Sequence, residues 1–138
     1  MQTYEFEHSV EGSASVEAVW GLWSDVARWT EWDGDLESIE LDGPFDAGTR
    51  GRMVMPGQPV IEFVLTEVVP GKGFTDETTV QGAVLRFAHE VEAVGAGRVK
   101  VTHRLVVEGA AAEEFGPVVA EGLPEAVERL VALASSSG

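Results

Sequence analysis

Six strand-like segments follow one another between residues 36 and 107, with no helical segment between them. They cover residues 36–41, 49–55, 60–69, 74–80, 83–94 and 98–107, and every break between them contains glycine or proline. Short turns join antiparallel neighbours, whereas parallel strands need long crossover connections, which are usually helices. The sequence therefore predicts an antiparallel meander.

Further elements flank this meander in the sequence. Before it, residues 4–10 alternate apolar and polar side chains as a strand does, and residues 16–24 and 26–32 show the helical spacing of apolar residues. After it, residues 111–134 carry an apolar stripe with helical spacing, and Pro124 predicts a break within this helix.

These elements combine into an α+β domain, which we expect to occupy residues 1–134. It consists of a strongly curved, seven-stranded antiparallel sheet around a long C-terminal helix, with two short helices after the first strand. A chain of 138 residues suits a single core of this kind. Residues 135–138, with the sequence Ser-Ser-Ser-Gly, are expected to form a flexible tail.

Turn chemistry sets the register of one central hairpin. A two-residue turn at residues 81–82 places Phe74 opposite His89. The same register places Asp76 opposite Phe87 and gathers aromatic and aliphatic side chains on one face of the sheet. This face is the predicted inner face.

The next hairpin brings histidines together. A three-residue loop at residues 95–97, with its last glycine in a left-handed conformation, places His103 opposite His89 on the inner face. Asp76 then lies diagonal to His89, and we expect it to be within hydrogen-bonding reach. His8 in the first strand also has inward parity, but no turn defines its partner.

Charge and composition exclude several classes of function. The chain has 24 acidic and 9 basic residues and a formal net charge of −15, which repels phosphate backbones and argues against nucleic-acid binding. It has no apolar run of about 18 residues and no signal-peptide pattern, so we expect a cytoplasmic protein without membrane insertion. Cysteine is absent, and no motif indicates a cofactor.

Several stretches together resemble a known superfamily. Residues 19–32 contain an apolar residue followed by tryptophan on a helix, then Asp25, then Trp29 and Trp32 three residues apart. Three further stretches carry the same resemblance: residues 87–90, 97–103 and 122–130. Over essentially the whole chain, they resemble the START/Bet v 1-like (SRPBCC) superfamily, in particular its bacterial polyketide cyclase/dehydrase-like members. The resemblance implies the helix-grip fold, with a cavity between sheet and helix.

A cavity of this kind predicts the binding of a small, largely apolar molecule that is polyketide-like, aromatic or a lipid. The alternative is that the same apolar side chains fill the core. The expected wall consists of inward-facing strand residues and two helix residues. They are Phe63, Leu65, Phe74, Thr78, Leu85, Phe87, Val101, Leu105, Leu123 and Val127.

Three polar residues interrupt this apolar face: Asp76, His89 and His103. A carboxylate beside His89 would fix the imidazole tautomer and raise its basicity, as general acid–base catalysis requires. The catalytic alternative is therefore an aromatase/cyclase or dehydratase. In the non-catalytic alternative, the two histidines bond to each other or to water and orient a ligand.

Two other interpretations are weaker. With His8, the three polar residues offer zinc-ligand chemistry, but no short-spaced ligand motif is present and no metal is expected. A protein-interaction domain of the co-chaperone type, with a collapsed cavity, is the remaining class. The protein is expected to be a monomer or homodimer.

Overall fold

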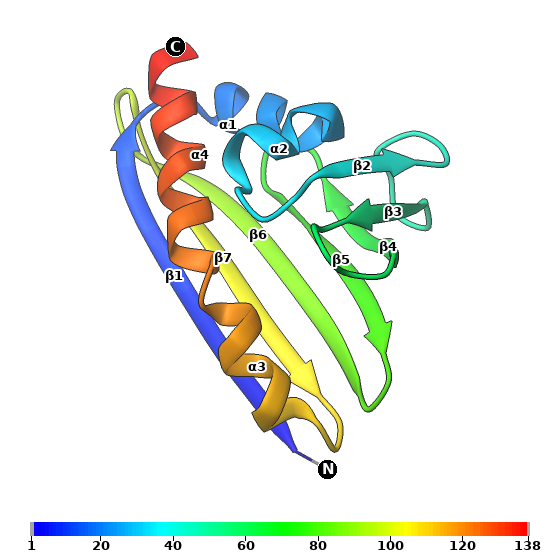
Figure 1. The fold of residues 1–138 in the computed structure, drawn as a ribbon. Coiled ribbons are helices and arrows are strands. Elements are labelled where there is room, and N and C mark those ends of the chain that lie inside the picture. The colour runs from blue at the N-terminus through cyan, green and yellow to red at the C-terminus, as the bar shows by residue number, and fades with distance from the viewer. Residues whose placement is uncertain (1, 138) are drawn as a thin grey trace.

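The computed structural model describes residues 2–137 and contains one sheet with helices on its concave side (Figure 1). Its elements are β1 (Thr3–Ser13), α1 (Val16–Ser24), η1 (Val26–Arg28), α2 (Trp29–Trp32), β2 (Ser38–Leu41), β3 (Arg50–Val54), β4 (Ile61–Val69), β5 (Gly73–Val80), β6 (Ala83–Gly95), β7 (Arg98–Glu108), α3 (Ala112–Ala120) and α4 (Leu123–Ser137). The strand order is β1-β7-β6-β5-β4-β3-β2, and all pairs are antiparallel. The predicted α+β fold is confirmed: β2 to β7 form the antiparallel meander, and β1 completes the seven-stranded sheet beside β7.

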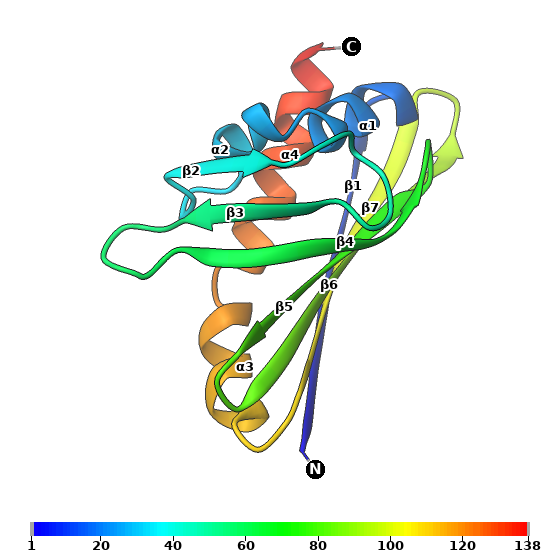
Figure 2. The same cartoon turned by 90° about the vertical axis from the view of Figure 1, so that its right-hand side faces the viewer.

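The sheet is bent so strongly that its two halves run in different directions. Figure 2 shows β2, β3 and β4 crossing the long strands β1, β7 and β6 at a steep angle. Helix α4 lies along the concave face, with α1 and α2 at one end of the molecule and α3 at the other (Figure 1). The inner face is therefore covered by different helices along its length.

The predicted hairpin registers are confirmed. Phe74 pairs with His89, and His89 pairs with His103. Gly97 has a φ of 69°, the left-handed conformation that the loop requires. β1 joins β7 so that His8 pairs with His103, which defines the partner that turn chemistry did not provide.

The inner face of β5, β6, β7 and β1 consists of rows of directly paired residues. The histidine row contains Phe74, His89, His103 and His8. The aspartate row contains Asp76, Phe87, Leu105 and Phe6. The threonine row contains Thr78, Leu85, Val107 and Tyr4.

The core divides into two apolar clusters along these rows. The larger cluster includes the tryptophans of α1 and α2, with Phe63, Phe74 and residues of α4. The smaller cluster joins the aspartate and threonine rows to α3, where Gly116 lies so close to Tyr4 that a Cβ atom would overlap the ring. On the inner face of β5, Asp76 and Thr78 lie between Phe74 of the larger cluster and Val80, which packs against the smaller cluster.

The C-terminal helix is broken as Pro124 predicted, because α3 ends at Ala120 and α4 begins at Leu123. Helix α4 then continues to Ser137, so residues 135–137 extend the helix beyond the expected domain end at residue 134. The Ser135 hydroxyl donates to the Val131 carbonyl oxygen at 2.9 Å, which ties this turn to the helix. Gly138 lies outside the described residues.

Replacing Gly73 with alanine should destabilise the protein by about 2 kcal/mol or more. The new Cβ would overlap the backbone carbonyl of His89, which is held in the β5–β6 ladder. Denaturant unfolding would measure the change. Gly21→Ala is the control, because its Cβ meets nothing within 4 Å on α1, and alanine should stabilise that helix by up to about 1 kcal/mol. Equal stability of the two variants would contradict this prediction.

Candidate functional site

The histidine row is sealed by aromatic side chains. The His89 ring stacks on Phe74, with ring centroids 3.9 Å apart and planes 7° from parallel. The His103 ring lies 4.5 Å from His89, and Trp23 lies 5.9 Å from each histidine. Both histidines are buried. This part of the inner face is packed core.

The environment of the row keeps both buried histidines neutral. Burial lowers the pKa of His89 to about 3, opposed by hydrogen bonds to backbone oxygens. Burial, with the nearby His89 and His8, lowers the pKa of His103 well below its ordinary value. Nδ1 of His89 donates to the Phe74 carbonyl oxygen at 3.3 Å, so the proton of the neutral ring resides on Nδ1.

Asp76 does not form the expected bond to His89. Within the described part of the chain, Nδ1 of His89 bonds to the Phe74 carbonyl oxygen, and no hydrogen bond involves the Asp76 carboxyl. Asp76 is only 3% exposed. Burial raises its pKa to about 8, and the negative charge of Asp33 adds to the effect. At neutral pH the carboxyl is therefore mainly protonated and is itself a hydrogen-bond donor.

Sequence reasoning missed the contribution of Asp33, whose position beside Gly34 is typical of a turn. The structure does form this turn, since Asp33 Oδ1 accepts from the Asp35 backbone N–H at 3.1 Å. Burial also raises the pKa of Asp33. Arg129 of α4 donates to the Glu31 carbonyl oxygen at 3.0 Å and so fixes the end of α2 against α4. No sequence signal pointed to the proximity of Asp33 and Asp76.

Four buried polar atoms have no hydrogen-bond partner among the described residues. They are Nε1 of Trp23, Nε1 of Trp32, Oγ1 of Thr78 and Nε2 of His103. A buried polar atom without a partner costs about 1–3 kcal/mol, so a hydrogen-bond partner would stabilise each of these four atoms. Thr78 lies two residues from Asp76 on the same strand face, and Trp32 precedes Asp33.

Nine of the ten predicted wall residues, Thr78 among them, are buried and Phe87 is half-buried, but their surroundings differ. The larger cluster takes Phe63, Leu65, Phe74, Val101 and Val127. The smaller cluster takes Leu85 and Leu105, with a half-buried Phe87, and Leu123 is buried at the start of α4. Contact of these ten residues with a ligand stays a prediction.

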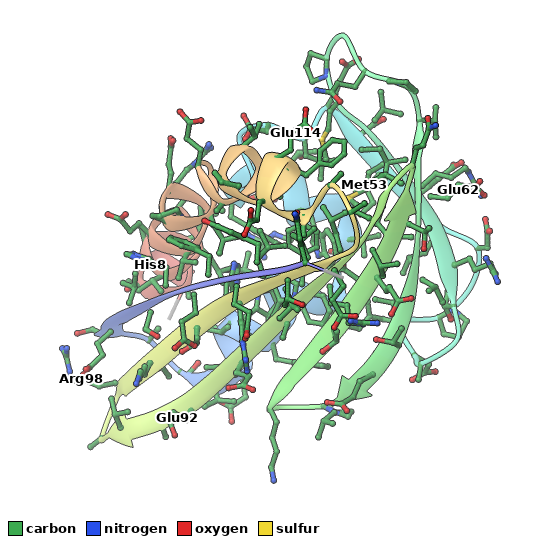
Figure 3. All side chains as sticks on the ribbon, turned by 90° about the horizontal axis from the view of Figure 1, so that it is seen from below. His8, Met53, Glu62, Glu92, Arg98 and Glu114 are labelled. Carbon is green, nitrogen blue, oxygen red and sulfur yellow. The ribbon has the colours of Figure 1, made fainter. Side chains whose placement is uncertain are left out.

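One hollow of about 570 Å³ lies mainly on the opposite, outer side of the sheet. Two predicted site residues, Phe74 and His89, reach its lining, which otherwise consists largely of outer-face strand residues and the turn before β5. Figure 3 shows Glu92, one of its lining residues, on the outer side, whereas His8 lies beside α4. The charged lining differs from the predicted apolar pocket.

The metal interpretation finds no geometry to support it. Among residues 2–137, no three His, Asp or Glu side chains are grouped to hold an ion. His8 instead faces Glu128 of α4, with Nε2 4.0 Å from Oε2. None of the described helices has the length and apolar character needed to cross a membrane.

A curved sheet around a C-terminal helix, with polar groups buried on its inner face, defines a protein of the helix-grip class. The family described as "Polyketide cyclase / dehydrase and lipid transport" matches residues 3–134. The chain therefore belongs to this family, as its resemblance to the superfamily predicted. Among proteins with curated descriptions, none matches the sequence.

Solved structures show the same fold at low sequence identity. The Zhui aromatase/cyclase from Streptomyces sp. R1128 is 13% identical with a TM-score of 0.80, over 96% of this chain and 94% of that one. Norcoclaurine synthase from Thalictrum flavum, with dopamine and hydroxybenzaldehyde, is 16% identical with a TM-score of 0.75, over 99% and 89%. Ara h 8.0201 is 14% identical with a TM-score of 0.76, over 98% and 99%.

Replacing Asp76 with asparagine should change how stability depends on pH. The native state keeps Asp76 protonated up to a pKa of about 8, whereas the unfolded carboxyl ionises near 3.8. The native state therefore binds more protons in this window, and stability falls as pH rises. Relative to Asp76→Asn, wild-type stability should fall by up to about 1.4 kcal/mol per pH unit in denaturant unfolding. If the unfolding free energies of the wild type and Asp76→Asn changed with pH in parallel, Asp76 would titrate normally and the prediction would be wrong.

Proposed function

We propose that this protein binds a small, largely apolar molecule against the inner face of the sheet. The observation that carries the proposal is the unpartnered Thr78 hydroxyl beside the buried carboxyl of Asp76. Binding pockets are commonly apolar, with a few polar groups that orient the ligand. The family description, which names cyclases, dehydrases and lipid transport, supports the same class of function.

The aspartate and threonine rows are the best place for this molecule. The histidine row is filled by stacked rings, whereas Phe6, Phe87 and Val119 around the smaller cluster are only half-buried. Helix α3 covers this region, and Ala111, the residue at its N-cap position, forms no side-chain capping hydrogen bond. A ligand here would contact apolar rings and reach the polar groups of β5.

Filling this region should weaken binding. Leu85→Trp places an indole at the threonine row, and we expect the affinity for the neutral dye Nile red to fall at least about tenfold. Dye fluorescence would be titrated against each protein. Val60→Trp is the control, because Val60 is 57% exposed and lies outside the site.

Thr78→Val provides a second variant if Leu85→Trp does not fold. It removes the unpartnered hydroxyl at nearly constant volume, so the protein should keep its stability and bind Nile red several-fold more weakly. Wild-type protein that does not bind the dye, or dye binding unaffected by both inner-face variants, would contradict the proposed function.

A second candidate function is dehydration of a hydroxyketone, because Asp76 is a carboxylic acid that stays protonated at neutral pH. Asp76 would give its proton to the leaving hydroxyl, and the resulting carboxylate would take the proton next to the carbonyl. Water leaves, and the acid is restored. Burial lowers the pKa values of His89 and His103, the other predicted acid–base residues, so both are unprotonated at neutral pH and Asp76 is favoured as the proton donor.

A matched pair of variants separates catalysis from binding. Asp76→Asn should lower the dehydration rate of a β-hydroxyketone at least about 100-fold and leave Nile red binding within a few-fold. His89→Ala tests the alternative donor under the same assay. An unchanged rate in Asp76→Asn would exclude Asp76 as the acid.

A further inference from the structure

We propose that Asp76 makes the inner-face site selective for neutral ligands whose polar group is a hydrogen-bond acceptor, such as a ketone oxygen, and that carboxylates are rejected. This inference rests on the proposed function and specifies its ligand class. It narrows the ligand to uncharged oxygen compounds and excludes free fatty acids and phosphate esters.

The distribution of cations provides the first argument. The buried polar residues of the described chain are Asp76, Thr78, His89 and His103, and none of them is lysine or arginine. Four arginines are paired with carboxylates on the surface: Arg28, Arg52, Arg86 and Arg104. An anionic group on the inner face would meet no buried cation, and the cost of burying it would not be offset.

Arg129, the cation that interacts with Asp33, has another role. Arg129 donates to the Glu31 backbone, and its guanidinium lies where a side chain on Gly34 would be. It also lowers the pKa of Asp33, although burial outweighs this effect. Arg129 therefore serves the loop after α2, and the charge that shifts the pKa of Asp76 is that of Asp33.

The unpartnered atoms provide the second argument. Nε1 of Trp32 is a donor only, and the Thr78 hydroxyl can donate. An oxygen acceptor satisfies such groups, whereas an ammonium has no lone pair to offer them. The groups near Asp76 supply no positive charge to offset a bound anion, because His89 and His103 are neutral and Asp33 is acidic. An oxygen of a neutral ligand is thus the complementary partner.

Three probes with the same naphthalene body test the selectivity: 2-acetylnaphthalene, 2-naphthoate and 2-naphthylmethylammonium. We expect the wild-type protein at about pH 7 to bind the ketone at least tenfold more tightly than either ion, measured by calorimetry or NMR titration. Equal or tighter binding of naphthoate or of the ammonium would overturn the selectivity and leave the proposed function intact. If Nile red binds but none of the three probes does, this inference fails and the proposed function stands; if Nile red does not bind either, both fail.

The role of Asp76 is tested by the pH profile of ketone binding. Ionisation turns the carboxyl from a donor into an acceptor-only group, so wild-type affinity should fall several-fold as pH rises above about 8. Asp76→Asn stays neutral and should bind the ketone with a flat profile. Glu77→Gln, on the outer face of the same strand, should keep the wild-type profile. A flat wild-type profile, or a fall that persists in Asp76→Asn, would exclude Asp76 as the determinant.

Discussion

The pairing of β6 with its two neighbours determines what the inner face contains. Side chains alternate between the faces of a strand, so a slip of one residue would exchange every inward residue for an outward one. The β5–β6 register brings Asp76 and Thr78 inwards and sends Glu77 out to Arg86, to which it is bonded at 3.0 Å. The β6–β7 register then aligns His89 with His103. These two ladders therefore place the buried polar residues on the inner face and the ion pair of Glu77 with Arg86 on the outer face.

The sequence was sufficient for the ladders because turn chemistry and charge pairing act locally. Gly82 and Gly97 both adopt positive φ angles at the predicted turns. The prediction of a hydrogen bond between Asp76 and His89 was wrong for a physical reason. Diagonal residues have Cα atoms about 7–8 Å apart, and an aspartate side chain is too short to span this separation. The Phe74 carbonyl, directly across the ladder, is the nearer acceptor for the imidazole.

The positions of the helices on the inner face were harder to predict than the strand pairing of the sheet. Which rows are packed tightly depends on where α1, α2 and α3 lie, and this is determined by contacts between residues far apart in sequence. Trp29 illustrates the point, because its indole N–H donates to the Trp23 carbonyl oxygen at 2.8 Å while its ring stacks with Phe63. The burial of Asp33 near Asp76 likewise comes from tertiary packing rather than from the turn that contains it.

The position of β1 has a consequence for how the chain folds. β1 is paired along its whole length with β7, from Thr3 with Glu108 to Ser13 with Arg98. Closing this pair joins segments at nearly opposite ends of the chain, which carries a large loop-closure entropy and slows folding. During synthesis, β1 has no partner until β7 has left the ribosome, and its paired edge stays open to other strands until then. The meander from β2 to β7 can form earlier from local hairpins, so the docking of β1 is expected to be a late step.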